Sequence, residues 1–230
     1  MRKLIGLSGI ALLFCYGAQA AEKLELPNFE VGIGAGSVPK SKAYDLDLTI
    51  NVPLPYYLSG QILLDSDYIS GDGRLGSYAQ SEFSGLLYLR NRDGRLGFGL
   101  GTKQHKPRNQ NLESKTTVIG RASAALFFGD FTFSTMYVNY DTDLDNTSSN
   151  ESGFTYFASE HKSVSLYREV FDNEEAWRIE MASRYDDEGL SSIRMIVRDG
   201  SSDESFYLAL QYRYYFDSQY TLKERDRLFY

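Results

Sequence analysis

Polar and apolar residues alternate along most of this chain, from about residue 28 to residue 216. One segment shows the pattern without interruption, with apolar side chains at one set of alternate positions and polar side chains at the other: Tyr44, Leu46, Leu48, Ile50 and Val52 against Asp45, Asp47, Thr49 and Asn51. A period of two is that of a β-strand, because successive side chains of a strand point to opposite faces. The pattern therefore predicts strands with one apolar face and one polar face.

The alternation predicts twelve strands. Most are close to the ~9–11 residues with which a tilted strand crosses a membrane. Their ranges are 28–38, 43–53, 56–66, 81–91, 95–105, 115–128, 131–140, 153–160, 163–171, 176–185, 190–199 and 205–216.

The connections between these strands are of two kinds. After the even-numbered strands they are tight, as at residues 92–94 and 129–130, whereas after several odd-numbered strands they are long and polar, as at 70–80, 106–114 and 141–152. Transmembrane barrels have short periplasmic turns and longer external loops. We therefore predict an all-β fold, a transmembrane antiparallel up-and-down β-barrel of about twelve strands with both ends periplasmic.

Two of the predicted strands fit this scheme less well than the others. The eighth, 153–160, is short, and in the ninth either Arg168 or Glu169 faces lipid whichever register is chosen. A charge at the membrane midplane costs roughly 2–4 kcal/mol for arginine and less for glutamate, so a bulge or a position near the rim is needed. A barrel of ten strands is the alternative.

The twelfth strand is an apolar ladder that ends in Phe216: Phe206, Leu208, Leu210, Tyr212, Tyr214 and Phe216. It resembles the carboxy-terminal insertion signal of Gram-negative outer-membrane β-barrel proteins. The resemblance covers residues 1–20 and 28–216, rests on pattern, and indicates no specific subfamily. It implies a place in the outer membrane of the cell envelope and recognition of Phe206–Phe216 by the barrel-assembly machinery.

The chain departs from that class at its carboxy-terminal end. In many members the terminal phenylalanine is the last residue, whereas here a charged extension follows, residues 217–230. We expect either a periplasmic extension or a short helix that caps the lower mouth.

The first twenty residues have the features of a secretory signal peptide, with Arg2 and Lys3 followed by an apolar stretch and an Ala-x-Ala site that ends at Ala20. A lipoprotein signal at Cys15 is the alternative, but Phe14 precedes it where lipid attachment needs a small side chain. Removal of this segment takes away the only cysteine and changes the formal charge from −7 to −9, because Arg2 and Lys3 are its only charged residues. A mature chain of residues 21–230 therefore forms no disulfide or thiolate metal site, and its acidity argues against nucleic-acid binding.

The polar faces of the strands are expected to line the lumen. They carry acidic residues in the first four strands and basic residues in the last three: Glu30, Asp45, Asp47, Asp65 and Glu82 against Arg178, Arg184, Arg194, Arg198 and Arg213. Closure of the barrel brings these two walls together. One interpretation is a transverse field across a water-filled constriction, and the other is a set of salt bridges that stabilise the barrel.

Basic residues also gather near the predicted outer rim: Lys40, Lys42, Lys103, Lys106 and Arg108. Phosphates of lipopolysaccharide lie at that height, so we expect lipid-phosphate contacts there, with a solvated basic rim as the alternative.

The sequence offers no convincing catalytic constellation, cofactor motif or metal site. Its only histidines, His105 and His161, are placed at opposite ends of the predicted barrel, so they cannot act together. Alternating glycines at 32–36 and 97–101 lack the spacing and the following helix of a phosphate-binding loop. Residues 141–152 begin like a calcium loop but lack its glycine and its last glutamate, which leaves at most a weak surface site.

These observations favour a monomeric outer-membrane barrel that serves as a small passive channel for polar solutes. The alternatives are a structural or surface-interaction barrel without transport, an outer-membrane enzyme, and a soluble periplasmic β-sandwich.

Overall fold

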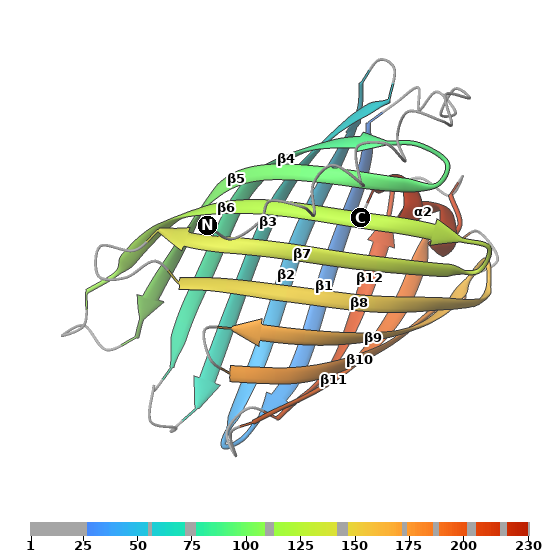
Figure 1. Cartoon of the computed structure of the whole chain (residues 1–230). Helices are drawn as coiled ribbons and strands as arrows, with labels where there is room; N and C mark the ends of the chain where they lie inside the picture. The colour runs from blue at the N-terminus through green and yellow to red at the C-terminus, as the bar shows by residue number, and fades with distance from the viewer. Residues whose placement is uncertain are drawn as a thin grey trace.

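The structure is a computed structural model of the chain, and it describes residues 27–54, 57–71, 77–108, 113–141, 147–171, 174–185, 189–201, 206–216 and 220–229. The expected signal peptide, residues 1–20, lies outside the described residues. Within the described ranges the chain forms twelve strands and one helix (Figure 1): β1 (Asn28–Val38), β2 (Ser41–Pro53), β3 (Leu58–Gly71), β4 (Tyr78–Arg90), β5 (Gly94–Pro107), β6 (Lys115–Phe128), β7 (Phe131–Asp141), β8 (Thr147–Ser159), β9 (Lys162–Phe171), β10 (Glu174–Arg184), β11 (Ser191–Gly200), β12 (Tyr207–Tyr215) and α2 (Leu222–Phe229).

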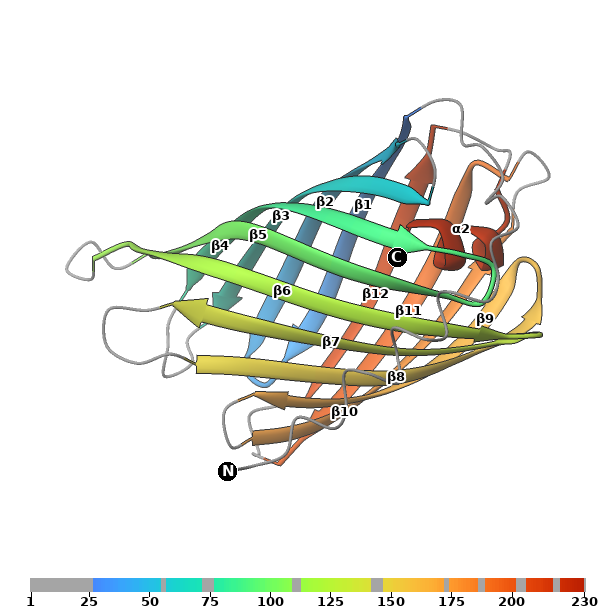
Figure 2. The same cartoon turned by 45° about the horizontal axis from the view of Figure 1, so that its top comes forward.

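The strands form one closed antiparallel barrel. Each strand pairs with the next along the chain, and β1 pairs with β12, for example through Val31 and Tyr214 (Figure 2). A closed sheet has no edge strand, which is a requirement for β-structure in lipid. The prediction of a twelve-stranded up-and-down barrel is confirmed, and the alternatives of ten strands and of a β-sandwich are wrong.

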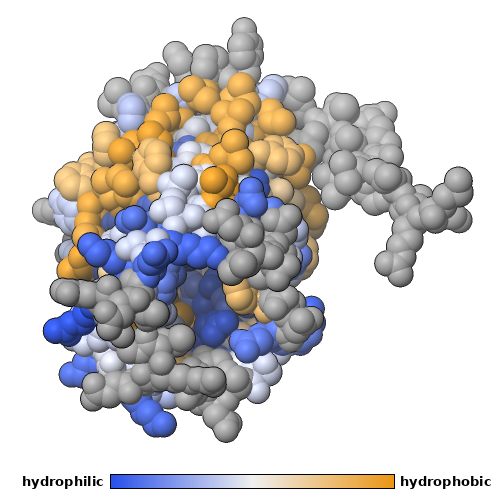
Figure 3. Space-filling model, turned by 90° about the vertical axis from the view of Figure 1, so that its left-hand side faces the viewer, coloured by the Kyte–Doolittle hydropathy of each residue, from blue (hydrophilic) through white to orange (hydrophobic). Residues whose placement is uncertain are grey.

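The outer wall of the barrel is apolar and its interior is polar. Leu100 and Leu210 on the outside are 72% and 58% exposed, whereas Glu30 and Arg95 on the inside are 0% and 6% exposed. Figure 3, which views the molecule from the end where β7 finishes and β8 begins, shows hydrophobic residues along the wall and hydrophilic residues around a central hollow. This inverted distribution is stable when hydrocarbon surrounds the wall, so the barrel is membrane-embedded.

The weakest predicted strand, the eighth, is longer than expected. β8 begins at Thr147, so the second half of the loop predicted at 141–152 is strand, and the register shifts between Phe157 and Ser159. In β9 Glu169 faces the interior, while Arg168 faces outward and its guanidinium lies 2.5 Å from the carboxylate of Glu175. Arg168 is three residues from the end of β9, and this place near the rim relieves the cost of an outward charge.

The two ends of the barrel differ. The end at which even-numbered strands finish, here called the short-turn end, has tight connections such as Gly129–Asp130, where Gly129 adopts a positive φ of 54°. The opposite end, at which the odd-numbered strands finish, is here called the long-loop end.

Residues 222–229 form a short helix, the second of the two alternatives expected for the charged tail. Thr221 and Glu224 form a capping box: the N–H of Glu224 donates to Thr221 Oγ1 at 3.1 Å, and the N–H of Thr221 donates to Glu224 Oε2 at 2.8 Å. Both views place α2 inside the ring of strands at one end of the barrel (Figures 1 and 2). No helix in the described part of the chain has the length and apolarity needed to cross a membrane.

Candidate functional site: the lumen and its helical plug

The charged residues assigned to the lumen lie on the interior faces of their strands. All are buried or half-buried in the structure: Glu30, Asp45, Asp47, Asp65, Glu82, Arg178, Arg184, Arg194, Arg198 and Arg213. Their partners divide most of them into four sets: a charge-balanced wall, a network that joins β12 to β1 and β2, an acidic group, and a set that contacts α2.

The charge-balanced wall is formed by β8 to β11. Arg178 contacts three glutamates, and two further arginines contact two of the same glutamates: Arg178 with Glu151 at 2.8 Å, with Glu180 at 2.8 Å and with Glu169, Arg194 with Glu180 at 3.4 Å, and Arg198 with Glu169 at 2.6 Å. Three arginines and three glutamates therefore neutralise one another. Along β8 to β11 the described residues therefore do not form the basic wall that a transverse field requires. Glu151 and Glu169 were not counted in the sequence-based assignment.

A second network joins β12 to β1 and β2. Arg213 donates to Asp47 at 3.0 Å and lies 3.4 Å from Glu30, while Gln211 donates to Asp45 at 2.7 Å and to Asp47 at 2.9 Å. These side chains pass over Gly32 of β1, where an added Cβ would lie 2.2 Å from an Asp47 oxygen. The alternating glycines of β1 thus leave room for charged neighbours.

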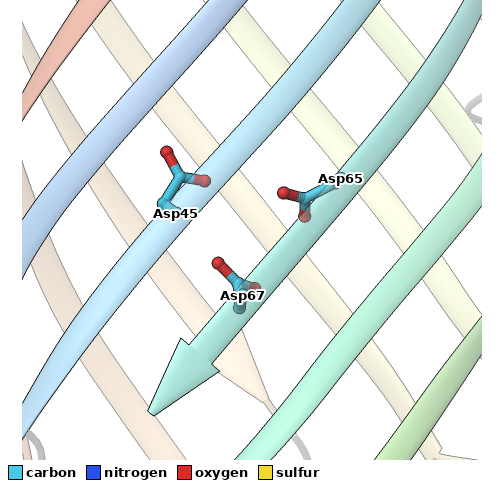
Figure 4. Close-up of side chains that lie close together, drawn as sticks. All are labelled: Asp45, Asp65 and Asp67. Atoms are coloured by element: carbon cyan, nitrogen blue, oxygen red, sulfur yellow. The ribbon is translucent and has the colours of Figure 1, made fainter. Parts of the chain in front are cut away.

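Three aspartates of β2 and β3 form an acidic group nearer the long-loop end. Asp45, Asp65 and Asp67 point toward one another, with carboxylate oxygens within 4.8 Å (Figure 4). Gln80 donates to Asp67 at 3.3 Å, and none of the three forms an ion pair within the described residues. Oxygens at this spacing suit a hard cation, but acidic groups commonly adopt it without one. Asp143 and Asp145, considered for a weak calcium loop, lie outside the described residues.

The helix α2 is held in the short-turn mouth by a buried ion pair. The Arg225 guanidinium donates to Glu30 at 3.1 Å and to Asn28 at 3.0 Å, and it lies over the Tyr215 ring at 4.0 Å from the centroid. Arg225 is 1% exposed and Glu30 is fully buried. The pair therefore replaces hydration completely, and removal of either partner would leave a buried charge.

The carbonyl groups at the end of α2 contact the opposite wall. Gln61 donates to Phe229 O at 2.7 Å, Arg90 to Leu228 O at 3.5 Å and Arg95 to Asp226 O at 3.1 Å. Carbonyls in the last turn of a helix have no partner within the helix and form the negative end of its dipole. Cationic and amide side chains of β3, β4 and β5 thus donate hydrogen bonds to the free carbonyl groups at the carboxy-terminal end of α2.

Further contacts fix the rest of the helix to other parts of the mouth. Lys223 donates to Asp130 at 2.8 Å and to Glu160 at 3.0 Å, Thr132 of β7 donates to the Asp226 carboxylate at 2.7 Å, and Arg184 of β10 donates to Tyr220 O. Wall contacts on β1, β3, β4, β5, β7 and β12 surround α2, and Arg184 of β10 fixes Tyr220 just before it, so the helix is a plug.

The ion pair of Lys223 is stable over a wide pH range. Its hydrogen bond to Asp130 lowers the pKa of that carboxyl below the usual 3.8, and hydrogen bonds to Asp130 and Glu160 raise the pKa of Lys223 above the usual 10.5. The acid's contribution is lost only as the pH falls through the lowered value, and the amine's only as the pH rises through the raised one.

Above the plug lies a cavity of about 310 Å³. Its floor includes Leu222, Arg225 and Asp226 of α2, and its walls combine the charge-balanced network with hydroxyl and aromatic side chains such as Ser165 and Tyr167. The cavity has room for a small polar solute and ends at the helix.

The basic residues of the predicted rim do not form one cluster. Lys40 and Lys42 belong to the β1–β2 hairpin, and Lys106 and Arg108 lie at the end of β5, with β3 and β4 between them. Lys103 faces the interior, with its ammonium 5.9 Å from the centroid of the Tyr140 ring, so it is turned away from lipid. Contact of the other four with lipopolysaccharide phosphates stays a prediction.

The two histidines lie at opposite ends of the barrel. His105 is in β5 near the long-loop end, with its ring 4.6 Å from that of Tyr78, and His161 is in the turn between β8 and β9. They cannot act on one substrate together.

The sequence analysis missed the residues through which α2 binds the barrel. The Thr221–Glu224 spacing was a readable sign of a helix start, and Leu222, Arg225 and Phe229 follow the spacing of one buried helical face. The partners of that face, Arg90 and Arg95 among them, come together only when the barrel closes.

No family model matches this chain, and no curated protein matches its sequence. Its structure is similar to that of KdgM porin, with 9% sequence identity, a TM-score of 0.61 and coverage of 82% of this chain and 99% of that chain. KdgM porin in complex with disordered oligogalacturonate gives 9% identity and a TM-score of 0.60, with the same coverage of 82% and 99%. An outer membrane channel from Pseudomonas putida F1 gives 14% identity, a TM-score of 0.62 and coverage of 87% and 98%. These neighbours are channels and not enzymes, and this chain has the fold of the outer-membrane β-barrels.

Proposed function

We propose that this protein is a passive channel for small polar solutes in the outer membrane of a Gram-negative bacterium. The observation that carries the proposal is the polar cavity of about 310 Å³ inside a membrane-embedded wall, open above a helix that is not part of that wall. The similarity in fold to porins and channels supports it. In this proposal α2 closes the short-turn mouth and must move for a solute to pass.

The charge-balanced wall suits solutes without a strong net charge. Since Arg178, Arg194 and Arg198 are matched by glutamates, an ion in the cavity gains little from the wall as a whole. Hydroxyl groups of residues such as Ser165 and Thr155 offer donors and acceptors to a polar solute.

A structural barrel without transport is the second candidate. The observation that favours it is the plug itself, because α2 contacts six strands around the mouth and its central ion pair is buried.

Conductance in planar bilayers distinguishes the two functions. We expect short, infrequent openings for the natural chain and longer openings for Arg225→Ala, which removes the buried contact of the plug. Arg168→Ala is the matched control, because Arg168 is an exposed arginine on the outer face and does not contact α2. Silent bilayers for both the natural chain and Arg225→Ala would contradict the channel and favour the structural barrel.

A further inference from the structure

Two buried arginines face each other beside the last turn of α2. Arg90 of β4 and Arg95 of β5 are direct cross-strand partners, both point into the lumen, and they are 4% and 6% exposed. Like charges in directly opposed positions destabilise a sheet, and burial adds to the cost. Within the described residues neither arginine forms an ion pair with a carboxylate, so this part of the wall is not neutralised as the charge-balanced wall is.

The groups that accept hydrogen bonds from these arginines carry only partial negative charge, and the Asp226 carboxylate, which accepts from Thr132, acts on Arg95 from beyond ion-pair distance. Arg90 contacts Leu228 O at 3.5 Å, Arg95 contacts Asp226 O at 3.1 Å, and the Arg95 guanidinium lies over the Tyr88 ring at 4.9 Å from the centroid. The end of a helix carries roughly half an elementary charge. With the single charge of the Asp226 carboxylate it is set here against two full positive charges, so part of the positive charge stays unbalanced. Moreover, the buried Nε of Arg90 has no hydrogen-bond partner. The two arginines can therefore bind an anion more strongly than they bind these carbonyl groups.

The lumen gives access to one member of this pair, Arg95, while α2 is docked. Arg95 lines the 310 Å³ cavity, next to Tyr88 and Arg121. Arg121 is already paired, at 2.5 Å from Glu82, whereas within the described residues Arg95 has no carboxylate at ion-pair distance and donates to a carbonyl.

We propose that Arg90 and Arg95 form a binding site for a small oxyanion, a carboxylate or a phosphate, which competes with the last-turn carbonyls of α2. An oxyanion binds a guanidinium through two parallel hydrogen bonds and with a full charge, which a single carbonyl cannot match. Binding takes away the contacts of Leu228 O and Asp226 O and so weakens docking of the helix. The anion is thus a ligand that releases the plug. Its role as an opener rests on the proposed channel, whereas the binding and the release do not.

Amide hydrogen exchange of residues 222–229 tests the proposal on the full chain in detergent micelles. We expect inorganic phosphate to speed exchange of this segment about fivefold or more, a coupling of ordinary size between two sites. Sodium chloride at the same ionic strength is the reference, because salt alone weakens the ion pairs of Lys223 and Arg225. Unchanged protection in phosphate relative to chloride would overturn the proposal without any variant.

Two variants locate the effect. Arg95→Gln keeps a donor for Asp226 O but removes the charge, so phosphate should no longer change exchange of α2. In Arg198→Gln, a matched lumen arginine away from the helix, the response to phosphate should persist. An equal response in Arg95→Gln and the natural chain would place the anion elsewhere and refute the site.

The result is independent of conductance. Silent bilayers together with a phosphate response would refute the channel and leave this site intact. Channel openings without a phosphate response would support the channel and refute the anion site.

Discussion

The charge-balanced wall and the short-turn mouth solve the same physical problem in different ways. In the wall, Arg178, Arg194 and Arg198 find carboxylates on neighbouring strands of the same sheet. In the mouth, Arg90 and Arg95 find carbonyls of a helix that the sheet does not contain. Neutrality is permanent in the first region and depends on the position of α2 in the second. A removable partner is what a gate needs, and a permanent one is what a rigid wall needs.

The largest expected effect comes from the one completely buried ion pair. Arg225→Ala removes the closer of the two arginines that pair with Glu30, together with the contacts of the helix with Asn28 and Tyr215. Breaking a buried pair costs about 3–5 kcal/mol, or a factor of about 100 or more. We expect hydrogen exchange of residues 222–229 to accelerate by that factor while exchange of the strands stays as it was.

A control separates loss of the helix contact from damage to the wall. Glu30→Gln with Arg225→Ala also removes the carboxylate that has lost its closer arginine, and it should leave the barrel folded by gel mobility of unheated samples with α2 still released. Retained protection of α2 in Arg225→Ala would mean that the peripheral contacts of Lys223 and Arg184 hold the plug by themselves.

A region is predictable from the sequence when the pattern that specifies it lies within a short stretch of residues. Most strands were predicted to within a few residues, because a period of two is visible in any ten residues. The third strand ends five residues later than predicted and the eighth begins six residues earlier. Glu151 was missed, since it lies in a segment taken for a loop, and the facing of Glu169 was undecided because its neighbour Arg168 is also charged. Both errors affect the same wall.

The plug was harder to foresee for a different reason. A helix that fits into a polar lumen has no apolar stripe of the ordinary kind, and Arg225 replaces the expected hydrophobic residue at the centre of its buried face. Only the pairing of β1 with β12 brings Glu30 next to Arg213 and positions its carboxylate in the lumen, where Arg225 binds it. No local pattern contains that information.

A smaller effect is expected in the charge-balanced wall. Arg178→Ala leaves Glu151 without its arginine, while Glu169 and Glu180 keep Arg198 and Arg194. Because the Arg178 side chain is 23% exposed in a polar lumen, we expect about 1–3 kcal/mol of barrel stability to be lost. The temperature at which the fast-migrating folded band disappears from a gel should fall, with exchange of α2 unchanged.

The double variant Arg178→Ala with Glu151→Ala should recover part of that loss, since the unpaired carboxylate is gone. If Arg178→Ala released the plug as Arg225→Ala does, the two regions would be coupled, and the contrast between a permanent and a removable partner would be wrong.

The smallest effect is expected at the exposed pair outside the lumen. Arg168 and Glu175 lie 2.5 Å apart with side chains 48% and 55% exposed, and pairs of this kind contribute about 0–1 kcal/mol. Arg168→Ala should therefore leave both the gel transition and the exchange of α2 within error of the natural chain. The side chain of Arg225 is 1% exposed and that of Arg178 is 23% exposed. If the loss of stability decreases from Arg225 to Arg178 to Arg168, burial sets the strength of these ion pairs. A loss at Arg168 as large as that at Arg178 would instead show that the surrounding lipid, which lowers the local dielectric, strengthens pairs on the outer face.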